Sequence, residues 1–244
     1  MNGASGSAAS STVAGTTMAP DTARWLALGA VAGPILFTLA WIVLGLVSPG
    51  YTLWDLRVEP YSAISQPISG LGLGPTAPLM NAAFVLMGLL SIAGAVGIFQ
   101  GIQELSRRKR WTCAGLLALH GVGAIMAGIF TLESIMLHFA GFVLALTPIA
   151  TFLFIGRALR RVPRWRRLGS WLLLGSPLTL ALAILHFATF SPEAAGAGHG
   201  IGGLTQRILL VQLQAWLVAM GWLAFRGSPH TGRAAVEPLD SSAR

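Results

Sequence analysis

The sequence predicts an all-α protein, a polytopic transmembrane bundle of six helices with an interfacial or re-entrant segment between the first and second helices. Hydrophobic residues make up 54% of the 244 residues, charged residues make up 10%, and the mean hydropathy is +0.70. Soluble domains carry roughly 25% charged residues, so this chain cannot cover a globular surface with polar groups. Six apolar stretches also approach the length of about 20 residues that a helix needs to cross a bilayer.

The chain divides into two tails and one helical domain. Residues 1–23 are rich in Ser, Ala, Thr and Gly and show no apolar periodicity, so we expect a disordered N-terminal tail. The six-helix transmembrane domain covers residues 24–226, and residues 227–244 form a polar C-terminal tail. The spans are expected at residues 25–47, 77–100, 111–132, 134–159, 168–190 and 204–225.

Glycines and prolines indicate local features inside these spans. Gly29 and Gly33 stand four residues apart in the first span, a spacing that lets another helix approach closely. Pro148 lies inside the fourth span and Pro177 inside the fifth, where we expect a kink. The single cysteine, Cys113, excludes an intramolecular disulfide and a cysteine-based metal motif.

The stretch from Tyr61 to Leu73 is the one semi-polar segment of any length between the spans. It reads Tyr-Ser-Ala-Ile-Ser-Gln-Pro-Ile-Ser-Gly-Leu-Gly-Leu, which is too polar to cross a bilayer and too apolar for a free linker. Non-helical backbone at membrane depth occurs only where protein or a water-filled cavity satisfies its N–H and C=O groups. We therefore expect this stretch to form the wall of a site, as a re-entrant loop or as an interfacial helix.

The basic residues predict the orientation in the membrane. With six spans, every Lys and Arg except Arg57 and Arg207 falls on one side. The positive-inside rule assigns that side to the cytoplasm, so we expect both termini there and a multi-pass protein in the inner (plasma) membrane of a bacterial cell. The net charge of +8 is therefore a topology signal of short loops and not a nucleic-acid-binding face. Membrane lipids are the expected partners.

Ionisable residues inside a bilayer are costly and mark candidate sites. His138, His186 and Arg207 each lie roughly four or five residues from the outer end of their span, at about 1.5 Å per residue, and Glu133 lies at that surface. They can share an outward-facing polar pocket in which Glu133 neutralises Arg207; alternatively, they cap helix ends and face headgroup water. The pocket candidates are Ser65, Gln66, Ser69, Glu133, His138, His186 and Arg207.

His120 differs from these residues in depth. It lies on the order of 10 Å further into the membrane, too far to complete a metal shell with the others. We expect a neutral histidine that is hydrogen-bonded to a neighbouring helix.

Several short motifs follow one another between Trp25 and Phe225. They are residues 61–72 (Tyr-Ser-Ala-Ile-Ser-Gln-Pro-Ile-Ser-Gly-Leu-Gly), 78–84 (Pro-Leu-Met-Asn-Ala-Ala-Phe) with Gly88, 128–130 (Gly-Ile-Phe), His138, and 203–207 (Gly-Leu-Thr-Gln-Arg) with Trp216. In order and spacing they resemble a bacterial six-helix membrane family, domain of unknown function 998. That family's pattern has Phe-Pro-x-Asp where this chain has Phe130-Thr-Leu-Glu133. The resemblance implies the topology and a polar face, and no activity, because none is established for the family.

Three functions are consistent with these residues. The first is binding of a lipid or small amphiphile in the outward-facing pocket, without a cofactor. The second is an intramembrane metal-dependent lipid hydrolase resembling the ceramidase and adiponectin-receptor superfamily, in which Ser65, Glu133, His138 and His186 are ligands or orienting groups. A transition metal would be held by Glu133, His138 and His186, but two histidines and one carboxylate form only a minimal zinc shell, so no metal is expected. The third is an accessory subunit, with a membrane-protein partner or a second copy of the chain.

Overall fold

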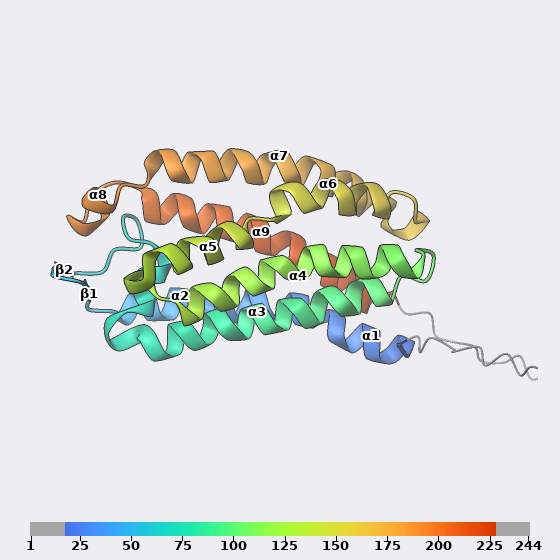
Figure 1. Ribbon diagram of the computed structural model, residues 1–244, viewed down its shortest axis with the longest axis horizontal. Helices are drawn as coiled ribbons and strands as arrows, with labels where there is room; N and C mark the ends of the chain where they lie inside the picture. The colour runs from blue at the N-terminus through green and yellow to red at the C-terminus, as the bar shows by residue number, and fades with distance from the viewer. Residues whose placement is uncertain (1–17, 228–244) are drawn as a thin grey trace, which may run out of the picture.

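The computed structural model describes residues 18–227, so residues 1–17 and 228–244 of the predicted tails lie outside the described part. Helices dominate it, and six helical stretches are long and apolar enough to cross a membrane (Figure 1). The predicted all-α bundle of six spans is therefore confirmed. The six stretches are Pro20–Val47, Gly74–Gln100, Arg107–Ile129, Leu132–Leu159, Pro163–Thr189 and Gly202–Phe225.

The first span consists of two helices, α1 (Pro20–Ala27) and α2 (Gly29–Val47), which meet at Leu28. Proline is favoured in the first turn of a helix because its missing N–H would have no partner there, and α1 begins at Pro20, inside the stretch predicted as a tail. The predicted close approach at Gly29 is present. A Cβ atom at this position would lie 2.3 Å from the carbonyl oxygen of Leu90 in the next span.

The second and third spans form an antiparallel pair, α3 (Ala77–Gln100) and α4 (Arg107–Ile129). The two backbones touch where Gly88 faces Gly121, since a Cβ atom on Gly88 would lie 2.4 Å from the carbonyl oxygen of Gly121. Ser106 caps α4 by accepting a hydrogen bond from the backbone N–H of Lys109. This pair provides the surface on which α2 and the next span pack.

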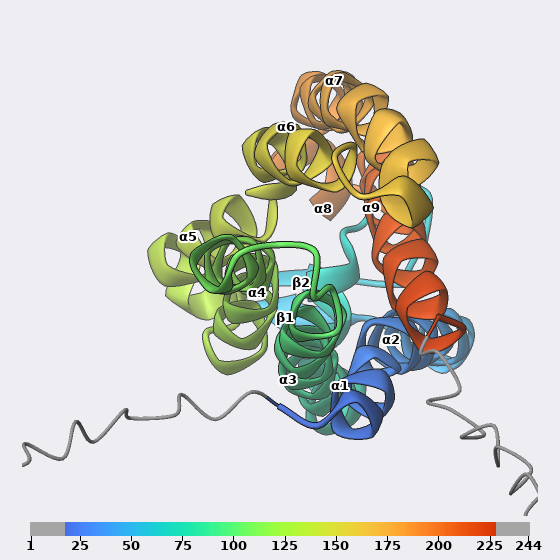
Figure 2. The ribbon, with the colours of Figure 1, turned by 90° about the vertical axis from the view of Figure 1, so that its right-hand side faces the viewer.

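The fourth span is broken at Leu146 and Thr147, between α5 (Ile135–Ala145) and α6 (Pro148–Leu159). Pro148 has no N–H and its ring clashes with the preceding turn, so α5 ends before it. The break redirects the chain, because α5 packs on α4 whereas α6 packs on the fifth span, α7 (Arg166–Thr189) (Figure 2). As a result α5 and α7 face each other across a space at one end of the bundle.

The sixth span, α9 (Gly202–Phe225), packs against both α7 and α2 and closes the bundle. One end of the bundle carries a β-hairpin and the short helix α8 (Pro192–Gly196), and we call it the hairpin end (Figure 1). The other carries the basic first turn of α4, from Arg107 to Arg110, and the turn between α6 and α7 with Arg160, Arg161 and Arg164, and we call it the arginine-rich end.

The chain between the first two spans contains structure that the sequence did not predict. Strands β1 (Tyr51–Leu53) and β2 (Leu56–Val58) form an antiparallel hairpin, with Tyr51 opposite Val58. After it come two short 3₁₀ helices, η1 (Ile68–Gly72) and η2 (Gly74–Thr76). The helix η1 is buried and contacts α2, α3 and α9. The semi-polar stretch is therefore folded back into the end of the bundle.

Candidate functional site

Residues 61–76, which we call the buried segment, are held in the bundle by one arginine of α9. The Arg207 side chain is 6% exposed. One of its terminal nitrogens donates to the carbonyl oxygens of Ala63 (2.7 Å), Gln66 (3.0 Å) and Gly203 (2.9 Å), and the other donates to the hydroxyl of Tyr61. The guanidinium therefore satisfies backbone carbonyls that the non-helical segment would otherwise leave unpaired in the membrane.

The predicted pairing of Arg207 with Glu133 is wrong. Glu133 lies on the surface in η3 (Leu132–Ser134), where the hydroxyl of Thr131 donates to its carboxylate. The guanidinium of Arg207 lies instead 5.3 Å from the ring centroid of Trp41 and 5.9 Å from that of Tyr61. Carbonyl dipoles and aromatic faces thus compensate the buried charge, which needs no carboxylate.

Two glutamines complete the attachment of the buried segment. The side-chain oxygen of Gln206 accepts a hydrogen bond of 2.7 Å from the backbone N–H of Ile68. The side-chain nitrogen of Gln66 donates to the carbonyl oxygen of Ala195 in α8, at 3.1 Å. The segment also lies directly on α9, because a Cβ atom at Gly203 would be 2.2 Å from the carbonyl oxygen of Gln66. These contacts fix the segment as one wall of a pocket.

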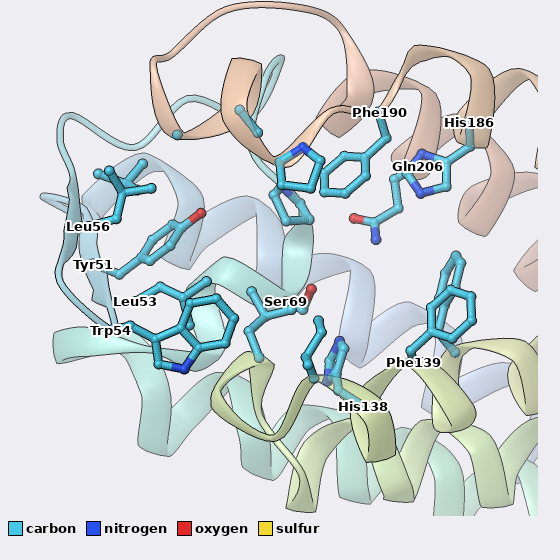
Figure 3. A pocket seen from close by; sticks show the side chains of 18 of the residues that line it. Tyr51, Leu53, Trp54, Leu56, Ser69, His138, Phe139, His186, Phe190 and Gln206 are labelled. Atoms are coloured by element: carbon cyan, nitrogen blue, oxygen red, sulfur yellow. The ribbon is translucent and has the colours of Figure 1, made fainter.

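The main pocket opens at the hairpin end, between the hairpin, the buried segment, α5, α7, α8 and α9 (Figure 3). Its volume is about 400 Å³, within the range of roughly 300–1,000 Å³ that is typical of small-molecule sites. Most of the lining is apolar, and its large apolar side chains are Leu53, Trp54, Leu56, Leu132, Ile135, Phe139, Phe142, Phe187 and Phe190. The polar side chains of the lining are Tyr51, Ser69, His138, His186 and Gln206.

An aromatic contact between α5 and α7 forms the lateral wall of the main pocket. The rings of Phe139 and Phe187 are 6.3 Å apart, and Phe142 lies 5.9 Å from Phe187. Phe139 is 48% exposed and Phe187 is 47% exposed, although both line the pocket. These two half-exposed rings therefore lie at the edge of the pocket, between α5 and α7.

His138 and His186 enter the main pocket from opposite sides (Figure 3). The Nδ1 atom of His138 lies 2.7 Å from the carbonyl oxygen of Phe130. Because a carbonyl oxygen only accepts, Nδ1 carries the proton and Nε2 is left as an acceptor. The Nδ1 atom of His186 lies 3.4 Å from the hydroxyl oxygen of Thr205. The carbonyl oxygen of Phe130 thus orients His138, and the hydroxyl of Thr205 on α9 orients His186.

Among residues 18–227, no carboxylate, lysine or arginine side chain lines the main pocket. Burial, followed by the nearby Tyr61, raises the pKa of Tyr51 to about 12, so the Tyr51 hydroxyl stays protonated at neutral pH. The side-chain amide of Gln206 points into the space (Figure 3). The site therefore offers neutral hydrogen-bond donors and acceptors on an apolar wall.

A second, inner cavity of about 40 Å³ lies deeper in the bundle, between α2, α3, α4, α5 and α9. Ser69, His138, Phe142 and Gln206 line both cavities, so the two adjoin. His120 lines the inner cavity, and its Nδ1 atom lies 2.7 Å from the carbonyl oxygen of Ala145 in α5. The predicted hydrogen bond of His120 to a neighbouring helix is present.

The structure divides the predicted pocket residues into three groups. Ser69, His138 and His186 line the main pocket. Ser65, Gln66 and Arg207 are buried outside its lining, and the last two hold the buried segment in place. Glu133 is exposed on the surface.

The proposed metal set of Glu133, His138 and His186 is not assembled. Within the described chain, no three His, Cys, Asp or Glu side chains are close enough together to hold a metal ion. Glu133 does not line the pocket that contains the two histidines, so the residues present do not fit a three-ligand site.

The sequence reasoning missed the aromatic lining of the pocket. Phe139 and Phe142 are three residues apart on α5, and Phe187 and Phe190 are three residues apart on α7. Residues with this spacing share one face of a helix. Two such pairs, at about the same membrane depth as His138 and His186, could have indicated an aromatic pocket wall in the sequence.

Six apolar spans with a neutral, aromatic-walled pocket at one end define a polytopic integral membrane protein. The chain belongs to the family described as protein of unknown function (DUF998), whose model matches residues 31–223. Comparisons with curated proteins and with solved structures found no significant match.

Proposed function

We propose that the main pocket binds a neutral amphiphile, with the chain of the ligand among the aromatic rings of α5 and α7. The observation that carries the proposal is a lining of large apolar side chains without a charged group. Removing an apolar chain from water is favourable by roughly 25 cal/mol per Å² of buried surface. The rings of Phe139, Phe142, Phe187 and Phe190 contribute to that surface here.

The absence of charge in the lining favours a neutral head group. Burying an ion without a partner costs several kcal/mol, and the nearest buried cation, Arg207, already donates to three carbonyl oxygens and the Tyr61 hydroxyl. A hydroxyl or ester group instead finds the side-chain amide of Gln206, the Nε2 acceptor of His138 and the Tyr51 hydroxyl. The ligand class that fits is therefore an alcohol or another uncharged lipid.

The position of the lateral wall supports entry from the bilayer. Phe139 and Phe187 are about half exposed and also line the pocket. Rotation of these two rings would open a path between α5 and α7, because α5 packs on α4 and the fourth span packs on α7 only after the Pro148 break, through α6.

Binding of three probes of equal chain length tests the proposal. The protein is placed in phosphatidylcholine nanodiscs, and a long-chain alcohol, an alkyl sulfate and an alkyl trimethylammonium compete against a radiolabelled alcohol. We expect the alcohol to bind at least about tenfold more tightly than either ion. A tenfold difference corresponds to about 1.4 kcal/mol, which is less than the several kcal/mol that burying an unpaired ion costs. Equal affinity for all three probes, or tightest binding of an ion, would contradict the proposal.

A matched pair of variants locates the binding measured in this way. Phe142→Ala removes a ring that lines both cavities, whereas Phe154→Ala removes a ring of α6 that is 46% exposed and lies outside the lining. We expect the first variant to weaken alcohol binding and the second to leave it unchanged.

We further propose that the hairpin end faces away from the cytoplasm. The support is the charge distribution, because the basic first turn of α4 and the basic turn before α7 lie together at the opposite end. Glu193→Cys at the hairpin end and Glu104→Cys at the arginine-rich end, each with Cys113→Ser, form a matched pair of exposed positions. An impermeant thiol reagent should label the first in intact cells and the second only after permeabilisation; the reverse pattern would invert the orientation.

A further inference from the structure

The inner cavity contains two buried polar atoms that the protein does not pair. The side chain of His120 is 1% exposed and that of Gln214 is 3% exposed. The Nε2 atom of His120 and the side-chain nitrogen of Gln214 have no hydrogen-bond partner within residues 18–227, and both residues line this cavity. Leaving a buried polar group unpaired costs about 1–3 kcal/mol, so a pair of such groups facing one space indicates a bound polar group.

The two unpaired atoms have complementary roles. His120 donates from Nδ1 to the carbonyl oxygen of Ala145, so its Nε2 atom accepts. The side-chain oxygen of Gln214 accepts a hydrogen bond of 2.8 Å from the hydroxyl of Thr38, and its side-chain nitrogen, which can only donate, remains unpaired within residues 18–227. A molecule between them must donate to one and accept from the other, and an O–H group does both.

The inner cavity is small enough that water is the molecule with an O–H group that fits it. Its volume is about 40 Å³, and a cavity needs roughly 10–15 Å³ of this measure to hold one water. Ser69, His138 and Gln206 line this cavity and the main pocket alike, and their polar side chains provide further partners along the shared wall. His138 is the one other titratable side chain of the lining within residues 18–227.

We propose that the inner cavity is a water-binding site, in which water donates to His120 and accepts from Gln214, and that this water is continuous with the main pocket. The site places His120, in the middle of the third span, in proton exchange with the hairpin side of the membrane. Toward the arginine-rich end the bundle is filled by buried apolar side chains, among them Leu117, Phe152 and Leu213. The hydrated path therefore ends at His120.

Solid-state NMR of the full-length protein in lipid bilayers tests this site independently of any ligand in the main pocket. The sample carries ¹⁵N-labelled histidine, and magnetisation is transferred from water protons to the imidazole nitrogens. We expect a water-transferred signal at the unprotonated Nε2 atom of His120, identified by its disappearance in His120→Gln. A folded wild-type protein without this signal would overturn the proposal.

A matched pair of valine substitutions assigns the water to the inner cavity. Ala124→Val fills part of the cavity from α4, whereas Ala140→Val adds the same two methyl groups on an exposed face of α5. The water-transferred signal of His120 should be lost in the first variant and kept in the second. Retention of the full signal in a folded Ala124→Val protein would place the water elsewhere and contradict the proposal.

Discussion

Replacing Arg207 with Ala is expected to lower the free energy of unfolding by about 3–5 kcal/mol. The guanidinium donates to the carbonyl oxygens of Ala63, Gln66 and Gly203 and to the Tyr61 hydroxyl, and alanine leaves all four without this donor. The measurement is unfolding in mixed micelles, combined with limited proteolysis of the buried segment. Membrane insertion should be preserved, because it depends on span hydrophobicity and loop charge.

Two further variants separate the geometry of Arg207 from its charge. Arg207→Lys keeps the positive charge but cannot reproduce the planar fork of donors, so we expect most of the loss to remain. Arg57→Ala removes the exposed pair with Glu59, whose atoms are 2.9 Å apart and whose side chains are 74% and 42% exposed, and should change little. A stable Arg207→Ala protein with a protease-resistant buried segment would show that other contacts hold this segment.

Replacing Gly97 with Val is expected to cost at least about 1–3 kcal/mol, the usual range for overpacking a core. A Cβ atom at this position would lie 2.3 Å from the backbone nitrogen of Ala27 and 2.6 Å from the carbonyl oxygen of Ala23. Both are backbone atoms of α1, so relief requires movement of the whole helix away from α3. The same unfolding assay reports the loss.

The control for this variant is a glycine substitution that should not lower the free energy of unfolding. A Cβ atom at Gly115 in α4 would meet nothing within 4 Å, and alanine in a helix is favoured over glycine by about 0.8–1.0 kcal/mol. Gly115→Ala should therefore leave the protein as stable as the wild type or more stable. If both glycine variants behaved alike, the close packing of α1 on α3 would not be the cause.

The sequence predicted the spans because hydropathy and length decide them. It placed Pro148 inside the fourth span but did not predict that the helix breaks there, although proline cannot continue a helix. The hairpin escaped prediction for a local reason. Its strands have three residues each, and Trp54 and Asp55 connect them in place of the Asn-Gly or Asp-Gly pair that marks such turns. Trp54 takes a positive φ of 51° there, which non-glycine residues rarely adopt.

The candidate site was predicted in position but not in chemistry. His138 and His186 do line one pocket. The sequence analysis paired Arg207 with Glu133, because the sequence does not show that the buried segment folds back onto α9 and supplies the partners of Arg207. The phenylalanines of α5 and α7 resemble lipid-facing residues in a sequence, since an apolar lining and an apolar exterior have the same composition. The cavity that Phe139, Phe142, Phe187 and Phe190 line shows that these rings enclose a space.

The central claim is that a neutral amphiphile occupies the main pocket, and photolabelling tests it most directly. The probe is a long-chain alcohol with a diazirine at the end of its chain, added to the protein in nanodiscs and mapped by mass spectrometry after digestion. We expect adducts on the pocket-lining parts of α5 and α7, around Phe142 and Phe187, that excess unlabelled alcohol abolishes. Adducts spread over exposed helix faces and insensitive to competition would contradict the claim.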